Sequence, residues 1–357
     1  MTPVRSSERR PVAFGYTWVR LPRPLSVRVP LRTLLVVALL LVLTLAALML
    51  SLMLGERFVP FADVLDALQG RARKIVELYV VTWRLPRGLS AIAVGALLGA
   101  SGAIFQTLTR NPLGSPDVIG FTTGAYTGGL VVIILAGTSA FLPVSAGSML
   151  GGLLTAGIVL ALTRRGQAQG FRLIIMGIAL TAMLTSLDTY MVLRTDLDTA
   201  FVAATWGIGS LSASIWSHVA PMLIAAVIAL LLCVPLSRPL AQLDLGDELG
   251  ASLGTRPGLT RTLAMLLGVV FVAISTTIAG PIAFVSLSAP QIARRLVRAQ
   301  GTPMLPAAAV GALGMLLADL IAQHAFPTGV QVGVVTVSLG GLYLIYLVIR
   351  ENRRGRL

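Results

Sequence analysis

Six long segments of this 357-residue chain contain no Asp, Glu, Lys or Arg. A helix needs about 20 residues to cross roughly 30 Å of hydrocarbon, so each segment can hold at least one membrane span and the longest can hold two. We therefore expect an all-α polytopic membrane protein with about ten transmembrane helices. The uncharged segments are 33–55, 88–109, 118–163, 199–237, 262–293 and 320–349.

The basic residues predict that both termini are cytoplasmic. The net charge is +14, and the arginines cluster at the ends of the apolar segments rather than on one amphipathic face. This is the positive-inside pattern of a membrane protein, and it argues against nucleic-acid binding. The predicted spans are 33–54, 88–108, 117–136, 143–163, 171–193, 218–236, 261–280, 281–299, 306–324 and 330–349.

Three regions follow from these spans. Residues 1–32 form an Arg-rich cytoplasmic extension, residues 33–350 form the transmembrane domain, and residues 351–357 form a basic cytoplasmic tail. On the outer side, Phe61–Val80 alternates apolar and polar positions at helical spacing, which predicts a short interfacial helix. On the inner side, the long amphipathic loop 237–258 indicates a docking surface.

Glycines and prolines indicate a packed bundle with interrupted spans. The runs from Gly95 to Gly99 and from Gly120 to Gly128 place small residues on one helical face, where two helices can approach closely. Gly280-Pro281 separates two spans, and residues 111–116 predict a hard turn between two others. Broken helices in a membrane are tolerated when they are buried in protein or line a cavity, which favours a transporter over a passive anchor.

The chain offers little chemistry of its own. We identify Asp188 and Asp319 as the carboxylates within or at the rim of a span, and interpret each as a helix cap or a bond to a neighbouring helix. His218 and His324 do not have metal-ligand spacing, and the single cysteine, Cys233, is interpreted as a small buried hydrophobe. We expect no catalytic residue and no metal site.

A phosphate-binding loop for ATP is also missing, because the only lysine, Lys74, is followed by Ile75. If transport is driven by ATP, the motor is another polypeptide to which this chain presents a surface. A secondary carrier coupled to an ion gradient is disfavoured, because two aspartates at the rims of spans make a poor relay.

Four strings give the chain a family resemblance. They are WRLPRGLSAIAVGALLGASGAIFQTLTRNPLGSPDVIGFTTGA (83–125), AQLDLGDELGASLG (241–254), AGPIAFVSLSAPQIARRL (279–296) and GVVTVSLGGLYLIYLV (333–348). In this order they resemble the iron-siderophore and cobalamin permease subunits of bacterial type II ABC importers, the FecCD/BtuC type, and within it the ferric-enterobactin permeases.

The resemblance implies a dimer of ten-span permease subunits in the bacterial inner membrane. Its partners would be a second permease subunit, identical or paralogous, two ABC ATPase subunits and an external substrate-binding protein. The chain would bind no cofactor itself, since ATP and Mg belong to the ATPase subunits.

The resemblance also implies roles for individual residues. Arg84 and Arg87 match external arginines that dock the binding protein, and Gln323 stands where a third docking arginine is usual. Residues 166–171 correspond to a cytoplasmic gate, with Gln167, Gln169 and Gly170. The loop matches the helices that couple to the ATPase, and the fifth and tenth spans would line the path. The coupling residues are Leu245, Gly246, Asp247, Glu248, Leu249, Leu253 and Gly254; the path residues are Met183, Ser186, Met191, Ser338 and Gly340.

Our first hypothesis is a permease that imports ferric siderophores by alternating access. A cobalamin or haem importer of the same architecture is the alternative, which the sequence separates poorly from the first. An ion-coupled secondary transporter is the third.

Overall fold

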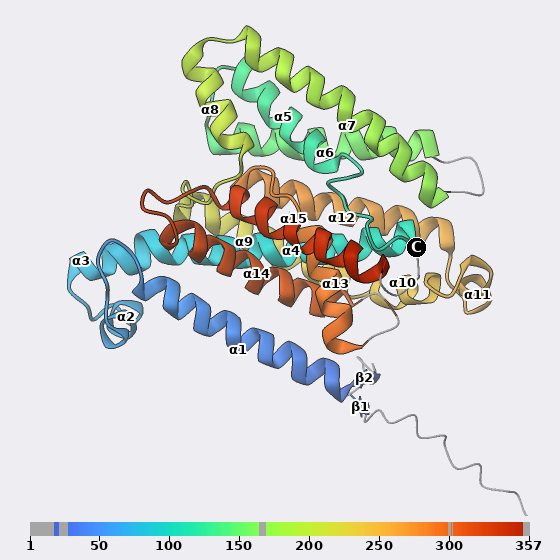
Figure 1. Cartoon of the computed structure of the whole chain (residues 1–357), viewed down its shortest axis with the longest axis horizontal. Coiled ribbons are helices and arrows are strands. Elements are labelled where there is room, and N and C mark those ends of the chain that lie inside the picture. Colours follow the sequence, from blue (N-terminus) through green and yellow to red (C-terminus); the bar gives the residue numbers. More distant parts are fainter. Residues whose placement is uncertain (1–17, 21–27, 164–168, 299–300, 302, 353–357) are drawn as a thin grey trace, which may run out of the picture.

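The computed structural model describes residues 18–20, 28–163, 169–298, 301 and 303–352, and these are almost entirely helical (Figure 1). Two three-residue strands, β1 (Trp18–Arg20) and β2 (Arg28–Pro30), pair antiparallel ahead of the first helix. The helices are α1 (Leu31–Met53), α2 (Phe61–Leu68), α3 (Lys74–Glu77), the π-helical segment η1 (Leu78–Arg84), α4 (Leu85–Thr109), α5 (Phe121–Leu135), α6 (Phe141–Thr163), α7 (Gln169–Arg194), α8 (Leu197–Gly207), α9 (Trp216–Cys233), α10 (Ser237–Leu243), α11 (Asp247–Ser252), α12 (Pro257–Ala279), α13 (Val285–Val297), α14 (Met304–His324) and α15 (Val332–Asn352).

Each of the ten predicted spans overlaps a helix of the structure. Among the described residues, seven helices are long and apolar enough to cross a membrane, and α5 and Val332–Tyr346 of α15 are shorter apolar helices. The span expected over 281–299 is wrong in length. Its helix, α13, has 13 residues, which extend about 20 Å and cannot cross the hydrocarbon alone. The helix starts late because Gly280 and Phe284 both adopt positive φ before it.

The interfacial helix expected over 61–80 is also different in the structure. It is broken after α2, where Gly70 adopts a φ of +69°. The chain becomes helical again at Lys74 and continues through η1 into α4, giving one apolar helix of 36 residues. The second half of the predicted helix is therefore the first part of a membrane span, because no residue between 74 and 84 interrupts the backbone.

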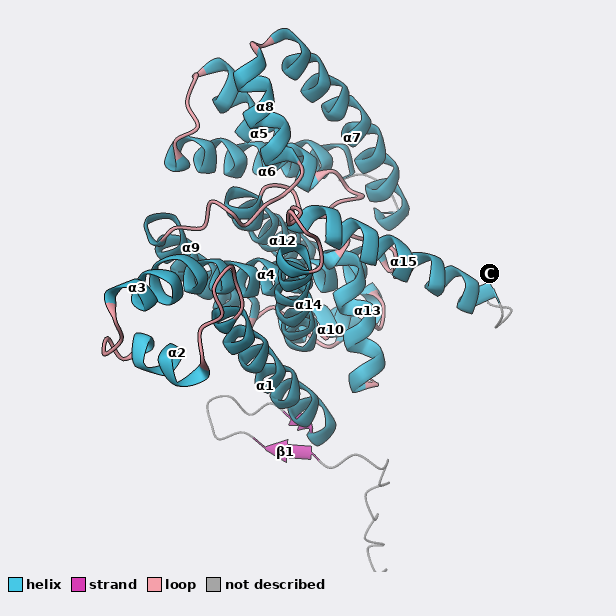
Figure 2. Cartoon of the chain, turned by 60° about the vertical axis from the view of Figure 1, so that its left-hand side comes forward, coloured by secondary structure: helices cyan, strands magenta, loops and turns pink. Residues whose placement is uncertain are grey.

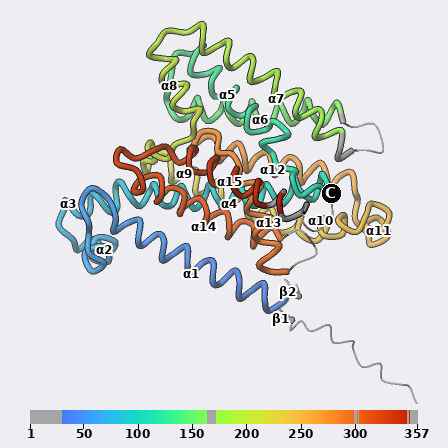
Figure 3. The backbone as a smooth tube through the Cα atoms, in the orientation of Figure 1, coloured from blue at the N-terminus to red at the C-terminus, as the bar shows by residue number. Residues whose placement is uncertain are grey.

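The helices form three layers, which Figures 1 and 2 show from two directions. Helices α5, α6, α7 and α8 form one layer, α4, α9 and α12–α15 form the middle, and α1 lies on the opposite side of the middle layer. The tube in Figure 3 shows α2 and α3 at one end of the bundle and α10 and α11 at the other. We call these the hairpin end (residues 54–84) and the loop end (residues 234–256).

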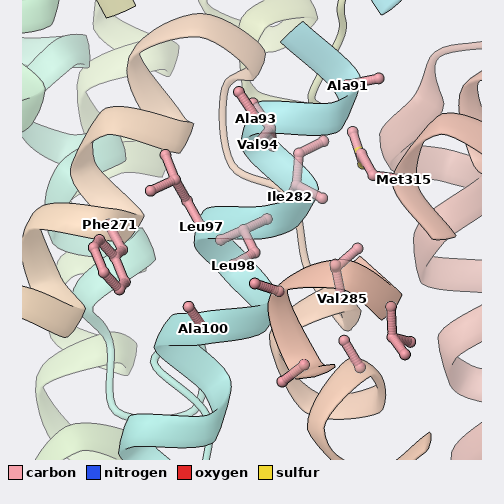
Figure 4. Close-up of a cluster of buried hydrophobic side chains, with 14 of the residues drawn as sticks. Ala91, Ala93, Val94, Leu97, Leu98, Ala100, Phe271, Ile282, Val285 and Met315 are labelled. Carbon is pink, nitrogen blue, oxygen red and sulfur yellow. The ribbon is translucent and has the colours of Figure 1, made fainter. Parts of the chain in front are cut away.

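The core is centred on α4, whose apolar part is mostly buried. Figure 4 shows Leu97 and Leu98 of α4 between Phe271 of α12 and Val285 of α13. A Cβ added to Gly95 or Gly99 would overlap the backbone of α14, and α5 and α6 approach each other in the same way at Gly124 and Gly128. The prediction that these glycines allow close helix packing is confirmed.

Candidate functional sites at the two ends of the bundle

The loop end carries two short helices hinged at glycines. Gly246 (φ +112°) separates α10 from α11, and Gly254 (φ +89°) follows α11, so both positions use backbone conformations that favour glycine. Leu240 and Leu243 are buried and hold α10 against the bundle. The loop is therefore anchored on one side and free on the other.

The free side of the loop presents three leucines at four-residue intervals. Leu245, Leu249 and Leu253 are 61%, 58% and 57% exposed, and we call them the leucine ridge. Three large apolar side chains on a polar loop are a feature of surfaces that bind another protein. These are the leucines that the sequence predicts for coupling.

The two acidic residues of the loop have different surroundings. The Asp247 carboxylate accepts hydrogen bonds from Arg110 and from Arg261, each with an N to O distance of 2.7 Å. Glu248 is exposed, and among the described residues no hydrogen bond or ion pair engages its side chain. Asp247 thus ties the loop to its own bundle, whereas Glu248 remains available to a basic residue of another protein.

At the hairpin end, the structure brings Arg87 and Gln323 together at one buried carboxylate. Arg87 makes a bidentate ion pair with Asp319, with an Nη2 to Oδ1 distance of 2.9 Å. The Gln323 amide donates to the other oxygen of Asp319 at 2.7 Å. Because the Asp319 side chain is fully buried and that of Arg87 is 22% exposed, this cluster joins α4 to α14. Our interpretation of Asp319 as a bond to a neighbouring helix is confirmed.

Arg84 does not share this cluster, although it lies three residues before Arg87. Its guanidinium donates to the backbone carbonyls of Leu52 (2.7 Å), Met53 (3.2 Å) and Arg57 (2.7 Å). These carbonyls include the last ones of α1, which have no partner within the helix. Arg84 thus closes the end of α1 and fixes where the hairpin starts.

The predicted path residues have mixed surroundings in the single chain. Met183, Ser186 and Ser338 are exposed, Met191 is partly exposed, and Gly340 is buried against Phe284. Helix α7 packs against α4, α5, α6 and α8, whereas α15 packs against α13 and α14. Of the gate residues, Gln167 lies outside the described residues, and the structure describes only the backbone of Gln169 and Gly170.

Two further carboxylates, Asp188 and Asp117, differ in how their oxygens are satisfied. Asp188 is 6% exposed, and its Oδ1 has no hydrogen-bond partner in the described part of the chain. Asp117, which the sequence analysis passed over, accepts hydrogen bonds from Thr122 and Ser286 at 2.6 Å each. Asp117 stands at the first position of the predicted span 117–136. A carboxylate at that position needs hydrogen-bond donors, and this could have identified it from the sequence.

Comparisons with known proteins agree with this arrangement. The chain is 44% identical to the ferric enterobactin transport system permease protein FepG of Escherichia coli K12 over 294 residues, which cover 82% of this chain and 89% of that protein. It is 36% identical to the probable siderophore transport system permease protein YfhA of Bacillus subtilis 168, covering 87% and 93%. It is 31% identical to the hemin transport system permease protein HmuU of Yersinia pestis, covering 78% and 83%.

A solved structure described as an inward-facing conformation of a metal-chelate type ABC transporter has the same fold. The two chains superpose with a TM-score of 0.77 at 25% identity, over 89% of this chain and 99% of the other. Residues 42–350 match the FecCD transport family. With ten helices in the expected order and a match over most of its length, the chain belongs to the FecCD transport family, the membrane permeases of ABC importers.

Proposed function

We propose that the chain is the permease subunit of an ATP-driven importer that takes up ferric siderophores by alternating access. The similarity to a ferric enterobactin permease and to a probable siderophore permease supports this substrate class. The lower identity to a hemin permease makes haem the second candidate. Substrate handling is non-covalent, and affinity for the substrate resides in a separate binding protein.

The leucine ridge is the observation that carries the ATP-driven part of the proposal. The chain lacks an ATP-binding loop, so it needs a surface through which another protein can move it. Leu245, Leu249 and Leu253 are apolar and exposed at a glycine-hinged loop. We assign this ridge to the groove of an ABC ATPase, with Glu248 facing a basic residue at its edge.

The assembly contains two such permease subunits, identical or paralogous, and two ATPase subunits at their loop ends. Both chain termini and the loop end face the cytoplasm of a bacterial cell, and the hairpin end faces outward. Met183, Ser186 and Ser338 lie on exposed faces of α7 and α15, where a second subunit would enclose a path between the two copies.

The external binding protein docks at the hairpin end. Arg87 retains 22% of its side-chain exposure while paired with Asp319, so a glutamate of the partner can reach the remaining N–H groups of the guanidinium. The Asp319 carboxylate holds that guanidinium in a fixed orientation, and Gln323 contributes a neutral donor beside it. Arg84 supports the site by fixing the start of the hairpin.

The test is uptake into proteoliposomes that contain the chain with its co-purified ATPase and binding protein. We expect ATP-dependent uptake of a ferric tricatecholate, and weaker or no uptake of haemin and cobalamin. Uptake of haemin or cobalamin without uptake of the ferric tricatecholate would show that the proposed substrate class is wrong. Uptake that continues without the ATPase and stops when a proton gradient is collapsed would overturn the proposal in favour of a secondary carrier.

A further inference from the structure

The turn between α4 and α5 (residues 110–120) is bonded at one side to the loop end. Arg110 ends α4 with a φ of +51°, which is uncommon for a residue with a side chain. Its guanidinium donates to Asp247 at the first position of α11. A movement of α11 therefore pulls directly on the start of this turn.

The other side of the turn is bonded to the start of α13. The Asp117 carboxylate accepts a hydrogen bond from the Ser286 hydroxyl at 2.6 Å. Ser286 is fully buried and lies two residues after Phe284, in the first turn of α13. Phe284 has a φ of +69°, a strained conformation for a bulky residue that persists only where its surroundings enforce it. Through Ser286, Asp117 fixes the first turn of α13 directly after Phe284.

Phe284 in turn contacts α15. A Cβ added to Gly340 would lie 2.6 Å from Cγ of Phe284, so only glycine allows α15 to lie this close to Phe284. Beside this contact is a cavity of about 200 Å³ between α13, α14 and α15. This pocket is open to the surface, so α15 has space on one side and a close contact with Phe284 on the other.

Two glutamines add further hydrogen bonds between α4, the turn and α13. The Gln291 amide of α13 donates to the carbonyl of Pro112 at 2.7 Å and to the Gln106 side chain of α4 at 3.2 Å. Gln106 donates in turn to the carbonyl of Leu287 at 3.0 Å. Asp117 is thus one of several groups that bond these elements, and its bond is the one made to the first turn of α13, directly after Phe284.

We propose that the turn 110–120 transmits movement of the α10–α11 loop to α15, with Asp117 as the positioning residue that holds Phe284 against Gly340. The proposal rests on the proposed function, because it takes the loop end as the place where the ATPase acts. Each link in the series is a contact of this chain: Asp247 with Arg110, Asp117 with Ser286 of α13, and Phe284 with Gly340.

The experiment compares two variants that each remove one hydrogen bond from the same carboxylate. Ser286→Ala removes the bond that joins Asp117 to α13, and Thr122→Val removes the bond that Asp117 makes within its own segment. The reconstituted importer is measured for uptake and for ATP hydrolysis. We expect Ser286→Ala and Asp117→Asn to lower uptake per ATP about fivefold or more while hydrolysis continues, and Thr122→Val to leave this ratio unchanged.

A structural role alone would give a different result. If Asp117 only needs its hydrogen bonds to be satisfied, Ser286→Ala and Thr122→Val would lower uptake and hydrolysis together, in proportion to the folded protein. That result would overturn the proposal, as would an unchanged ratio in Asp117→Asn. Asp196→Asn at the start of α8 is the matched control, because it removes a carboxylate charge outside this series and keeps the helix cap.

A second measurement separates this inference from the choice of substrate. Nitroxide labels at Leu50→Cys on α1 and Val337→Cys on α15, in a Cys233→Ala background, report the movement of α15 without any siderophore. We expect the label distance to change when the ATPase binds a non-hydrolysable ATP analogue, and to remain fixed in Ser286→Ala. An equal change of the label distance in the parent and in Ser286→Ala would overturn the linkage, whether or not ferric siderophore is taken up. A change in the parent alone would support the linkage, even if ferric siderophore is not taken up.

Discussion

The two ends of the bundle use the same pair of residue types for opposite purposes. At the hairpin end, Asp319 is fully buried and its arginine partner is 22% exposed. At the loop end, Asp247 is 42% exposed and is shared by two arginines. A buried pair that loses one member leaves an uncompensated charge, whereas an exposed pair exchanges with water at little cost. The first arrangement therefore holds two helices together, and the second holds a loop that can be released.

The largest effect is expected from breaking the buried pair. Asp319→Ala leaves the Arg87 guanidinium mostly buried without its carboxylate, and should lower the free energy of unfolding in detergent by about 3 kcal/mol. Thermal unfolding of the purified chain measures the loss. Asp66→Ala on exposed α2 is the matched control and should have an effect within about 0.5 kcal/mol. Equal stability of the two variants would contradict the structural role of the hairpin-end cluster.

The leucine ridge should matter for association and not for folding. Leu249→Gln removes an exposed apolar side chain, so the isolated chain should keep its stability. If the ridge is buried by the ATPase, affinity for that partner should fall by about 1.5 kcal/mol, roughly tenfold. Leu65→Gln at the hairpin end makes the same chemical change and should leave affinity unchanged. Weakening by both variants would show a general loss of integrity instead.

The exposed ion pairs of Asp247 should contribute less to the free energy of unfolding than to the coupling of ATP hydrolysis to uptake. Asp247→Asn should cost less than about 1 kcal/mol of unfolding free energy, because exposed ion pairs are weak. The same variant should lower uptake per ATP, since it loosens the loop from Arg110 and Arg261. A loss of stability as large as that of Asp319→Ala would remove the contrast between the two ends.

The smallest effect is expected at Gly250 of α11. An added Cβ would lie 3.4 Å from the carbonyl of Gln242 and from Leu243, which is ordinary contact, and Gly250 does not use a positive φ. Gly250→Ala should therefore stabilise the loop by about 0.5 kcal/mol. Amide hydrogen exchange of residues 247–252 measures the change. Faster exchange would indicate that α11 relies on the flexibility of this glycine.

The sequence predicted more of the fold than of the site. Its apolar segments predicted ten helices in the right order, because hydrocarbon imposes a length and composition on each span. It failed at 281–299 and 61–80, where one strained residue at Phe284 and one glycine at Gly70 decided the helix boundaries. Periodicity does not report such local conformations.

The candidate site shows the same division. The amphipathic pattern of the loop predicted that Leu245, Leu249 and Leu253 are exposed. They are exposed in the structure. One partner each of Arg87, Asp247 and Asp117 (Asp319, Arg110 and Ser286) lies 232, 137 and 169 residues away in the chain. No spacing rule identifies such pairs, because they depend on which helices pack side by side.

By itself, the amino-acid sequence determined that this protein resides in a membrane and carries no phosphate-binding loop for ATP, and it predicted the loop at which a partner would bind. Hydropathy and the absence of a phosphate-binding loop are properties of single segments, so a linear reading captures them. Only the tertiary structure decided which charged side chains form ion pairs within the bundle and which remain exposed to a partner. An ion pair forms where folding brings two side chains within a few ångströms, and that distance is set by the packing of α4 against α12, α13 and α14.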